Sequence, residues 1–301
     1  MNLMLRRTAI ALGISAPWAV SSAFAAKRID VSRLSAITDE IAPDQAGSVA
    51  FAQQYGLKWL ELRSKREIKK EYFHLPVEQL KADAKAFRDG GVGISFLNTS
   101  MLKFAIPGVE TINPRHMASA VRYEKRQQEL DKAIEAAHIL GTSKVRIFTY
   151  FRAKDQAGMV QRIADDIGPL AARAKKEGID LLIENENACN VASCGELVEL
   201  LKLIPDKNVG INWDPFNAEN TKEKAFPDGY QMLPKKRIGN VQIKGKSLLP
   251  SYTPMDWRGI FDTLIKDGYK GQVGLETHIF GETQIQMSHE CMKELVRMVA
   301  V

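Results

Sequence analysis

The sequence has few residues of the kinds that mark several large protein classes. Its three cysteines, Cys189, Cys194 and Cys291, are too few and too unevenly spaced for a structural zinc cluster. It has no glycine-rich phosphate loop, which argues against the common mononucleotide- and dinucleotide-binding folds. No basic run stands beside interleaved aromatic residues, so we expect no nucleic-acid partner.

The first 25 residues have the features of a secretory signal peptide. Their only charged residues are Arg6 and Arg7, which precede an apolar run over residues 8–20 and the cleavage-type sequence Ala23-Phe24-Ala25. The run is shorter than the roughly 20 residues that span a bilayer, so we expect no stable membrane anchor. The arginine pair favours a twin-arginine signal over an ordinary Sec signal, which can also contain two arginines. We therefore expect a periplasmic or secreted protein.

Residues 26–301 are expected to form a single domain. Without the two signal arginines the formal net charge falls from +6 to +4, which is too small to indicate a polyanionic partner. The length suits one large domain, and no Pro-, Ser- or Gly-rich linker divides it. The odd number of cysteines favours buried free thiols, with a Cys189–Cys194 disulfide as the alternative. The sequence leaves open whether the domain forms a homo-oligomer.

Strand-like and helix-like segments alternate along the whole domain. Apolar runs typical of strands cover residues 33–38, 58–62, 93–98, 144–149, 180–184, 209–213, 238–244 and 272–276. One segment with helical spacing ends near residue 55, and others cover 77–88, about 118–140, 159–176, 195–203, 257–266 and 284–298. Residues 219–236 are expected to form a loop with a short helix. Eight such units in about 270 residues match a closed parallel (β/α)8 TIM barrel, an α/β fold.

Each of the last four predicted strands has a residue that can bind a divalent metal within two residues of its carboxyl end: Glu184, Asp214, Gln242 and Glu276. In a barrel these strand ends surround one mouth, where the active sites of the fold lie. The main alternative to a barrel is an open doubly wound sheet, in which these residues would lie in a row along one edge of the sheet. Side chains alternate between the two faces of a strand, so all four residues can face the barrel axis.

Two glutamates, an aspartate and an amide oxygen form an oxygen-rich ligand set. Such a set suits Mn²⁺, Mg²⁺ or Co²⁺ better than a thiolate-type zinc site, although Zn²⁺ remains an option because availability can decide which ion is loaded. Polar residues also end strands simply because loops are polar, but four at successive strand ends weaken that explanation. We therefore predict a divalent metal site at the barrel mouth.

Several motifs resemble those of the sugar phosphate isomerase/epimerase, or xylose-isomerase-like, TIM-barrel superfamily. Residues 37–44 are similar to its first strand and turn, residues 55–63 to its second strand with a Gly-x-x-x-x-Glu-Leu-Arg pattern, and residues 141–148 to its fourth. On this resemblance the family's metal residues fall on Glu184, on Asp214 of a Trp-Asp-Pro motif and on Glu276 of a Leu-Glu-x-His motif. The resemblance covers nearly all of residues 26–301.

The seventh strand departs from the family pattern. Where the family usually has His-x-Lys-Asp, this sequence has Gln242-Ile243-Lys244-Gly245. Glutamine can still coordinate through its amide oxygen, and dehydratases of the superfamily that act on dehydroshikimate resemble this chain in having glutamine there. Replacing the imidazole with an amide favours a harder metal. The replacement argues more against epimerase chemistry than against metal binding.

The resemblance implies proton abstraction from a carbon beside a carbonyl, with the metal acting as a Lewis acid on the resulting enediolate. Glu184 and Glu276 would take and return the proton. In a lyase one of these glutamates would remove the proton while Lys244 or His278 assists departure of the β-oxygen. The pKa of Lys244 would be lowered by the nearby cation, or Lys244 would instead orient substrate hydroxyls. The predicted substrate-binding residues are Arg146, for which a structural ion pair with Glu61 or Glu184 is the alternative, Asn217 and His278.

Three functions remain open on this reading. The favoured one is an exported metal-dependent isomerase or epimerase acting on a small sugar or polyol. The alternatives are a lyase or dehydratase acting on a keto-sugar, keto-glycoside or cyclic polyol, and a catalytically inactive sugar-binding barrel. Export argues against a phosphorylated substrate, because sugar phosphates are cytosolic. Abasic-site endonuclease chemistry would need a histidine-rich trinuclear zinc site, and the chain has only five histidines.

Overall fold

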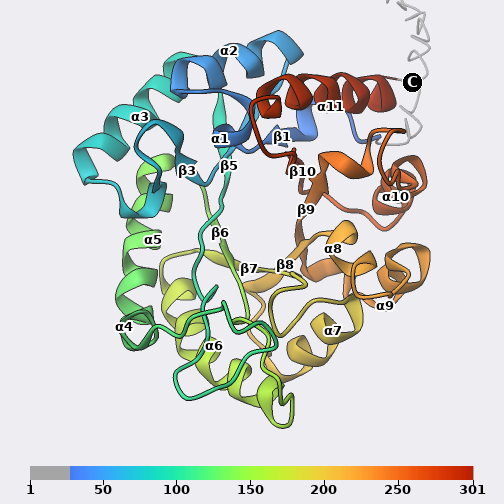
Figure 1. The fold of residues 1–301 in the computed structure, drawn as a ribbon. Coiled ribbons are helices and arrows are strands. Elements are labelled where there is room, and N and C mark those ends of the chain that lie inside the picture. Colours follow the sequence, from blue (N-terminus) through green and yellow to red (C-terminus); the bar gives the residue numbers. More distant parts are fainter. Residues whose placement is uncertain (1–27, 301) are drawn as a thin grey trace, which may run out of the picture.

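Eight parallel strands form one nearly closed barrel in the computed structural model, which describes residues 28–300 (Figure 1). The predicted signal peptide, residues 1–25, lies outside the described residues. The strands are β1 (Leu34–Ala36), β2 (Trp59–Leu62), β5 (Gly93–Leu97), β6 (Lys144–Ile147), β7 (Asp180–Glu184), β8 (Val209–Trp213), β9 (Ile238–Lys244) and β10 (Gln272–Glu276). The predicted TIM-barrel fold is therefore confirmed.

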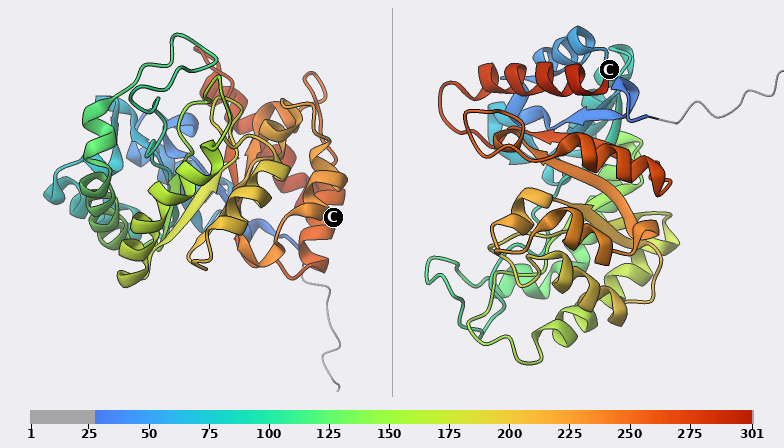
Figure 2. Two further views of the ribbon diagram at one scale, coloured as in Figure 1. Left: turned by 90° about the horizontal axis from the view of Figure 1, so that it is seen from below. Right: turned by 90° about the vertical axis from the view of Figure 1, so that its right-hand side faces the viewer.

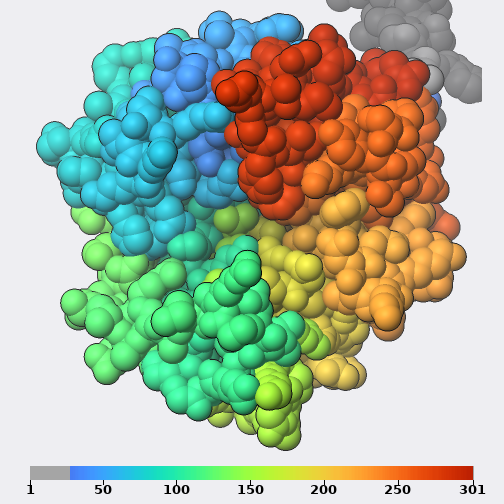
Figure 3. Space-filling view, in the orientation of Figure 1, coloured from blue at the N-terminus to red at the C-terminus, as the bar shows by residue number. Residues whose placement is uncertain are grey.

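The strands follow the order β1-β10-β9-β8-β7-β6-β5-β2 around the barrel. β1 and β2 are therefore the two edges of the sheet, and a single parallel bridge between Ile37 and Glu61 joins them. Figure 3 shows the same order on the surface: the chain runs once around the molecule, so its first and last parts lie side by side. We call the junction of β1 and β2 the seam.

Helices surround the barrel on its outer side (Figure 2). They are α1 (Thr38–Ile41), α2 (Gln45–Tyr55), α3 (Val77–Asp89), α4 (Ala120–Glu124), α5 (Arg126–Leu140), α6 (Met159–Lys176), α7 (Cys194–Leu203), α8 (Pro215–Glu219), α9 (Tyr230–Met232), α10 (Trp257–Lys266) and α11 (Gln284–Val299). Two further short strands, β3 (Ser64–Lys65) and β4 (Lys70–Glu71), form an antiparallel pair after β2. α11 packs against α1 and α2, so the last helix covers the seam.

Glycine ends two of the helices where the sequence pattern predicted a stop. Gly56 after α2 and Gly141 after α5 both have left-handed backbone, with φ of 69° and 77°. Glycine adopts this conformation without the steric penalty of a Cβ, so the chain can leave the helix and enter the next strand. These two helix ends therefore follow directly from local sequence.

Two elements differ from the sequence prediction. The helix expected over residues 118–140 is broken at Lys125, whose ψ of 8° is not helical, and Ser119 caps the separate helix α4 through a bond from the amide of Arg122. The first strand ends at Ala36, because the backbone turns into α1 at Thr38. Residues 98–119 form a long loop that contains only isolated bridges and projects beyond the strand ends (Figure 2).

Apolar packing fills the space between strands and helices, whereas the barrel interior is largely polar. Leu, Ile, Val and Ala side chains from the strands pack outward in one continuous core. The inward side chains include six fully or almost fully buried polar residues: Ser35, Glu61, Asn98, Asn212, Asn240 and Gln242. All three cysteines are buried free thiols. Within residues 28–300 no helix has the length and apolar character to cross a membrane.

Candidate active site at the carboxyl ends of the strands

Three buried carboxylates meet at the carboxyl ends of β7, β8 and β10. Glu184 is the last residue of β7, Glu276 is the last residue of β10, and Asp214 directly follows β8. One oxygen from each lies within 4.8 Å of the others, and none of the three residues is more than 4% exposed. The inward alternation predicted for these strands therefore brings the three side chains together. We call them the carboxylate triad.

The ammonium group of Lys244 lies in the middle of the triad. Its Nζ is 2.5 Å from Oε2 of Glu276, 3.1 Å from Oδ2 of Asp214 and 3.8 Å from Oε1 of Glu184. Burial alone would lower the pKa of Lys244, but the surrounding carboxylates outweigh it and raise this pKa well above its ordinary value. Lys244 is therefore positively charged in this arrangement, in which only the carboxylates surround it.

Asp214 is held by the helix that it begins. Its Oδ1 accepts a hydrogen bond from the backbone amide of Asn217 and caps α8, which has Pro215 at its first position. Its Oδ2 is buried and has only the ion pair with Lys244, without a further hydrogen bond. Burial and the neighbouring Glu184 and Glu276 carboxylates raise the pKa of Asp214 to about 7, although Lys244 opposes the shift. The triad therefore has more negative charge than Lys244 neutralises.

The two glutamates of the triad are oriented by different cations. Oε2 of Glu184 accepts bonds from Arg146 at 2.8 Å and from Asn212 at 3.0 Å, which leaves Oε1 facing Lys244. Oε1 of Glu276 accepts a bond of 2.8 Å from Arg63, and its Oε2 accepts the bond from Lys244. Burial would raise the pKa of Glu276, but Lys244, His278 and Arg63 hold it well below its usual range.

Gln242 lies two residues before Lys244 on β9 and is fully buried deeper in the barrel. Its Nε2 donates to the carbonyl of Gly274 at 3.0 Å, and its Oε1 accepts a bond of 3.3 Å from Asn212. The amide oxygen that we predicted as a metal ligand therefore accepts a bond from Asn212. Asn212 in turn links Gln242 to Glu184.

The three predicted substrate-binding residues occupy different environments. Arg146 is buried and forms the ion pair with Glu184 that was its structural alternative. Asn217 donates through its side chain to the backbone carbonyl of Asn185 at 3.0 Å, which ties α8 to the end of β7. His278 has a positive φ of 50° and a side chain that is 40% exposed, with Nδ1 3.5 Å from Oε1 of Glu276. Of the three, His278 is the most open to solvent at the mouth.

Two charged groups beside the triad were not predicted as site residues. Arg63 bonds Glu276 and also reaches Asp39 and Glu40 across the seam, at 2.8 and 2.9 Å. The Glu-Leu-Arg motif could have indicated Arg63 as a site residue. Arg63 lies two residues after the inward-facing Glu61, and side chains two apart on a strand share a face.

The second unpredicted group is an ion pair between Lys103 and Glu186, with 2.8 Å between Nζ and Oε2. Lys103 comes from the 98–119 loop and lies over the ring of Phe148, 4.4 Å from its centroid. Burial would raise the pKa of Glu186, but Lys103 and Lys244 hold it below its usual value. No local pattern predicts this pair, because it joins a long loop to the residue two positions after Glu184.

The site and fold agree with a family assignment of the sequence. The family described as "Xylose isomerase-like TIM barrel" matches residues 49–295, which is more than half of the chain. The protein therefore belongs to the xylose isomerase-like TIM barrel family. A search of curated protein sequences found no match.

Solved structures of distant relatives share the barrel. D-psicose 3-epimerase from Clostridium cellulolyticum H10, solved with D-tagatose, is 14% identical with a TM-score of 0.68, covering 89% of this chain and 99% of that chain. The 3-keto-D-glucoside 4-epimerase YcjR from E. coli is 13% identical with a TM-score of 0.65 and the same coverage. AsbF from Bacillus anthracis, a probable 3-DHS dehydratase, is 15% identical with a TM-score of 0.66, covering 87% and 98%.

The triad has the chemistry to hold a divalent cation. Carboxylate oxygens are the ligands that such cations prefer, and Asp214 offers a buried oxygen whose partner is the ammonium group of Lys244. A second group, made of Glu40, Glu276 and His278, also has ligand atoms within 4.8 Å of one another. Glu276 belongs to both groups, so it is the residue on which any cation at this mouth most depends.

Proposed function

We propose that the protein is a metal-dependent isomerase or epimerase acting on a small sugar or polyol. The observation that carries the proposal is the buried triad of Glu184, Asp214 and Glu276 at the mouth of a xylose isomerase-like barrel. Two structural relatives are named as sugar epimerases, which supports the same class of reaction. The proposed ligands are Glu184, Asp214 and Glu276, with Gln242 as a fourth if its amide oxygen turns from Asn212.

A bound Mn²⁺, Mg²⁺, Co²⁺ or Zn²⁺ ion would supply a Lewis acid for two neighbouring substrate oxygens. Glu184 is suited to remove a proton through Oε1, because Arg146 and Asn212 already hold its Oε2. Glu276, three strands away along the sheet order, can return a proton through Oε2 beside Lys244. Arg63 fixes the other oxygen of Glu276 and keeps its carboxylate oriented.

A lyase or dehydratase is the second candidate, and the contact between Lys244 and Glu276 favours it. An ammonium group 2.5 Å from a carboxylate can give its proton to a departing β-oxygen while Glu184 removes the proton from carbon. The probable dehydratase among the structural relatives supports this reading. The buried Gln242 adds to it, since the family's usual imidazole is absent from this strand.

The decisive experiment measures metal, exchange and product together. The protein comprising residues 26–301 is purified, its bound metal is quantified, and it is incubated in D₂O with ketoses, 3-keto-glucosides and dehydroshikimate. Deuterium incorporation with unchanged covalent composition supports isomerisation or epimerisation, and loss of water or of an aglycone supports elimination. Sugar binding without metal or exchange would overturn both enzyme proposals and leave the inactive sugar-binding barrel.

We also propose that the protein is exported to the periplasm or secreted, with residues 26–301 forming the working domain. The support is the sequence alone, with Arg6-Arg7 before an apolar run and Ala23-Phe24-Ala25 after it. In that compartment free sugars, keto-glycosides and cyclitols are more accessible substrates than sugar phosphates.

A further inference from the structure

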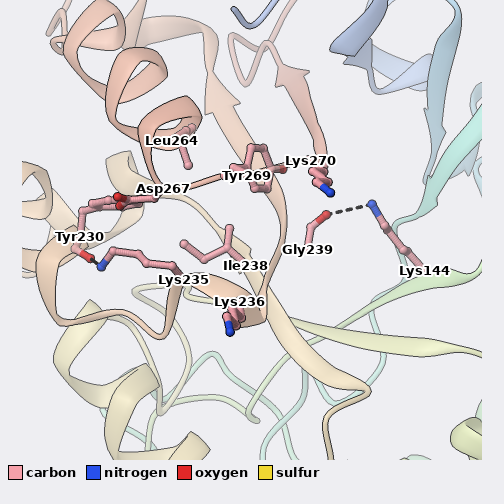
Figure 4. A pocket seen from close by; sticks show the side chains of 12 residues that line it. Lys144, Tyr230, Lys235, Lys236, Ile238, Gly239, Leu264, Asp267, Tyr269 and Lys270 are labelled. Atoms are coloured by element: carbon pink, nitrogen blue, oxygen red, sulfur yellow. Dashed lines mark hydrogen bonds between the residues drawn. The ribbon is translucent and has the colours of Figure 1, made fainter. Parts of the chain in front are cut away.

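A second pocket lies at the opposite end of the barrel from the triad. Its volume is about 380 Å³, and it is lined by the first residue of β6, by the segment between α9 and β9 and by the turn between α10 and β10. Lys144 begins β6, Ile238 begins β9 and Gly271 directly precedes β10, so the pocket opens at the amino ends of these strands (Figure 4). We call it the basal pocket.

Four lysines line the basal pocket: Lys144, Lys235, Lys236 and Lys270. Among residues 28–300, none of these four forms an ion pair with a carboxylate, whereas other lysines such as Lys81 and Lys85 do. The pocket's one acidic residue, Asp267, instead accepts a hydrogen bond of 3.0 Å from the hydroxyl of Tyr230. The lining therefore has an excess of positive charge.

Two of the lysines are held in place by uncharged acceptors. Lys144 donates to the carbonyl of Gly239 at 2.9 Å, which Figure 4 marks, and to Oε1 of Gln272 at 3.1 Å. Lys235 donates to the carbonyl of Tyr230, as Figure 4 marks, and to those of Gln231 and Leu233 at 3.0 and 2.9 Å. Burial lowers the pKa of both ammonium groups, and neither is ion-paired with a carboxylate of residues 28–300. An anion in the pocket would supply the missing compensation.

The remaining lining is apolar and aromatic. Ile238, Leu264 and the rings of Tyr230 and Tyr269 form the wall between the lysines (Figure 4). Leu264 and Tyr269 are buried, so the wall is anchored in the core. A purely inorganic ion would leave the small exposed part of this wall in contact with water, whereas an organic group would cover it. The volume is within the range of small-molecule sites.

We propose that the basal pocket binds a small organic oxyanion, a phosphate or carboxylate group attached to a compact apolar or aromatic body. The anionic group lies among the lysines and the body lies against Ile238, Leu264 and the tyrosines. This site is separate from the carboxylate triad and does not depend on the proposed enzymatic function. The ligand of the basal pocket is a different molecule from the proposed substrate, because the triad lies at the other end of the strands.

Isothermal titration calorimetry with phenyl phosphate and with benzoate tests the proposal. We expect saturable binding of at least one of them at a single site per chain, and the stronger of the two identifies the preferred oxyanion. Benzyl alcohol, which lacks the charge, and inorganic phosphate, which lacks the ring, should each bind at least tenfold more weakly. No saturable binding of either aromatic anion would overturn the proposal.

A pair of double variants tests where the anion binds. Lys236→Gln with Lys270→Gln removes two exposed lysines of the pocket and should weaken binding at least tenfold. Lys81→Gln with Lys85→Gln removes the same charge from exposed, ion-paired lysines on α3 and should leave binding unchanged. Equal weakening by both pairs would show a general charge effect and overturn the assignment to this pocket. Unchanged melting temperatures confirm that both proteins are folded.

Discussion

Lys244 places a positive charge where three carboxylates converge. A buried carboxylate without a counter-charge is strongly destabilised, so the ammonium group stabilises the triad as long as no other cation is bound. A divalent ion and this ammonium group compete for the same oxygens. Metal binding at the triad therefore requires Lys244 to turn away, which also frees it to donate to a substrate.

We predict that Lys244→Met tightens the binding of Mn²⁺ at least tenfold, because the competing charge is removed while the side-chain volume is nearly kept. The metal-free variant should be less stable than the parent, since three carboxylates lose their common partner. Calorimetric titration with Mn²⁺ and melting temperatures with and without metal measure both effects. Lys103→Met, which breaks a nearby ion pair with Glu186, is the control. Equal metal affinity in parent and Lys244→Met would refute the competition.

Glu184→Gln and Glu276→Gln should each lower kcat by about 10²–10⁴-fold, the usual contribution of a general acid or base. The amide keeps the size of the side chain but cannot exchange the proton. Turnover of the substrate found in the D₂O experiment provides the measurement, and Glu110→Gln, at an exposed surface ion pair, is the control. If both triad variants retain full activity, the assignment of the site is wrong.

At the scale of single elements, a capping box fixes the start of α7. The hydroxyl of Ser193 accepts from the amide of Glu196, and the Glu196 carboxylate accepts from the amides of Ser193 and Ala192 and from Arg152. Burial would raise the pKa of Glu196, but these hydrogen bonds outweigh it and hold the pKa below its ordinary value of 4.5. The charged form of Glu196 therefore stabilises the fold.

We predict that Glu196→Gln lowers the free energy of unfolding by about 1 kcal/mol at pH 7. Because the folded-state pKa is depressed, the stabilisation is fully present above pH 4.5 and is lost as the pH falls through the folded-state value. Denaturant unfolding of parent and variant at a series of pH values should show the gap closing in acid. Glu199→Gln, at an exposed position of the same helix, should produce no such gap.

Gly274 on β10 leaves the space that the buried carboxylate of Glu61 occupies. A methyl group at residue 274 would lie 1.8 Å from Oε1 of Glu61. This oxygen accepts bonds from Ser35 and Asn240, and Oε2 of the same carboxylate accepts one from Asn98. Burial raises the pKa of Glu61 while these hydrogen bonds oppose the shift. The polar interior is therefore packed around a single side chain from β2.

Gly274→Ala should lower the free energy of unfolding by roughly 1–3 kcal/mol or more through overpacking. The same change in a Glu61→Ala background should cost clearly less, because the clashing carboxylate is gone, and a double-mutant cycle measures the difference. Gly168→Ala in α6, where an added methyl meets no atom within 4 Å, is the matched control and should be neutral or stabilising. Additive effects of Glu61→Ala and Gly274→Ala would contradict this account.

The alternation of elements could be predicted from the sequence because it depends on local periodicity. β7, β8, β9 and β10 match their predicted ranges, and the triad follows from the side-chain alternation along them. The partner of Gln242 could not be predicted, because Asn212 and Gln242 share an inward face and only the register decides which groups bond. Likewise, Arg63 and Glu276 are 213 residues apart, so their contact follows from barrel closure rather than from any local motif.

At the scale of the whole molecule, the proposed export can be tested by its signal. Replacing Arg6 and Arg7 with lysines should keep the protein in the cytoplasm if the twin-arginine reading is correct, because that pathway requires the arginine pair. Immunoblots of periplasmic and cytoplasmic fractions measure the distribution. Continued export of the Lys-Lys variant would indicate a Sec signal, and cytoplasmic location of the unchanged protein would exclude export.

Arg63 has a consequence for the order in which the molecule is made. Its partners Asp39 and Glu40 precede it in the chain and are synthesised before it, whereas Glu276 lies 213 residues after it. Until β10 is synthesised, the guanidinium group can bind only the two early carboxylates, and the triad lacks a member. Completion of β10 brings Glu276 to Arg63 and joins β1 to β9, so the last strand completes both the site and the sheet.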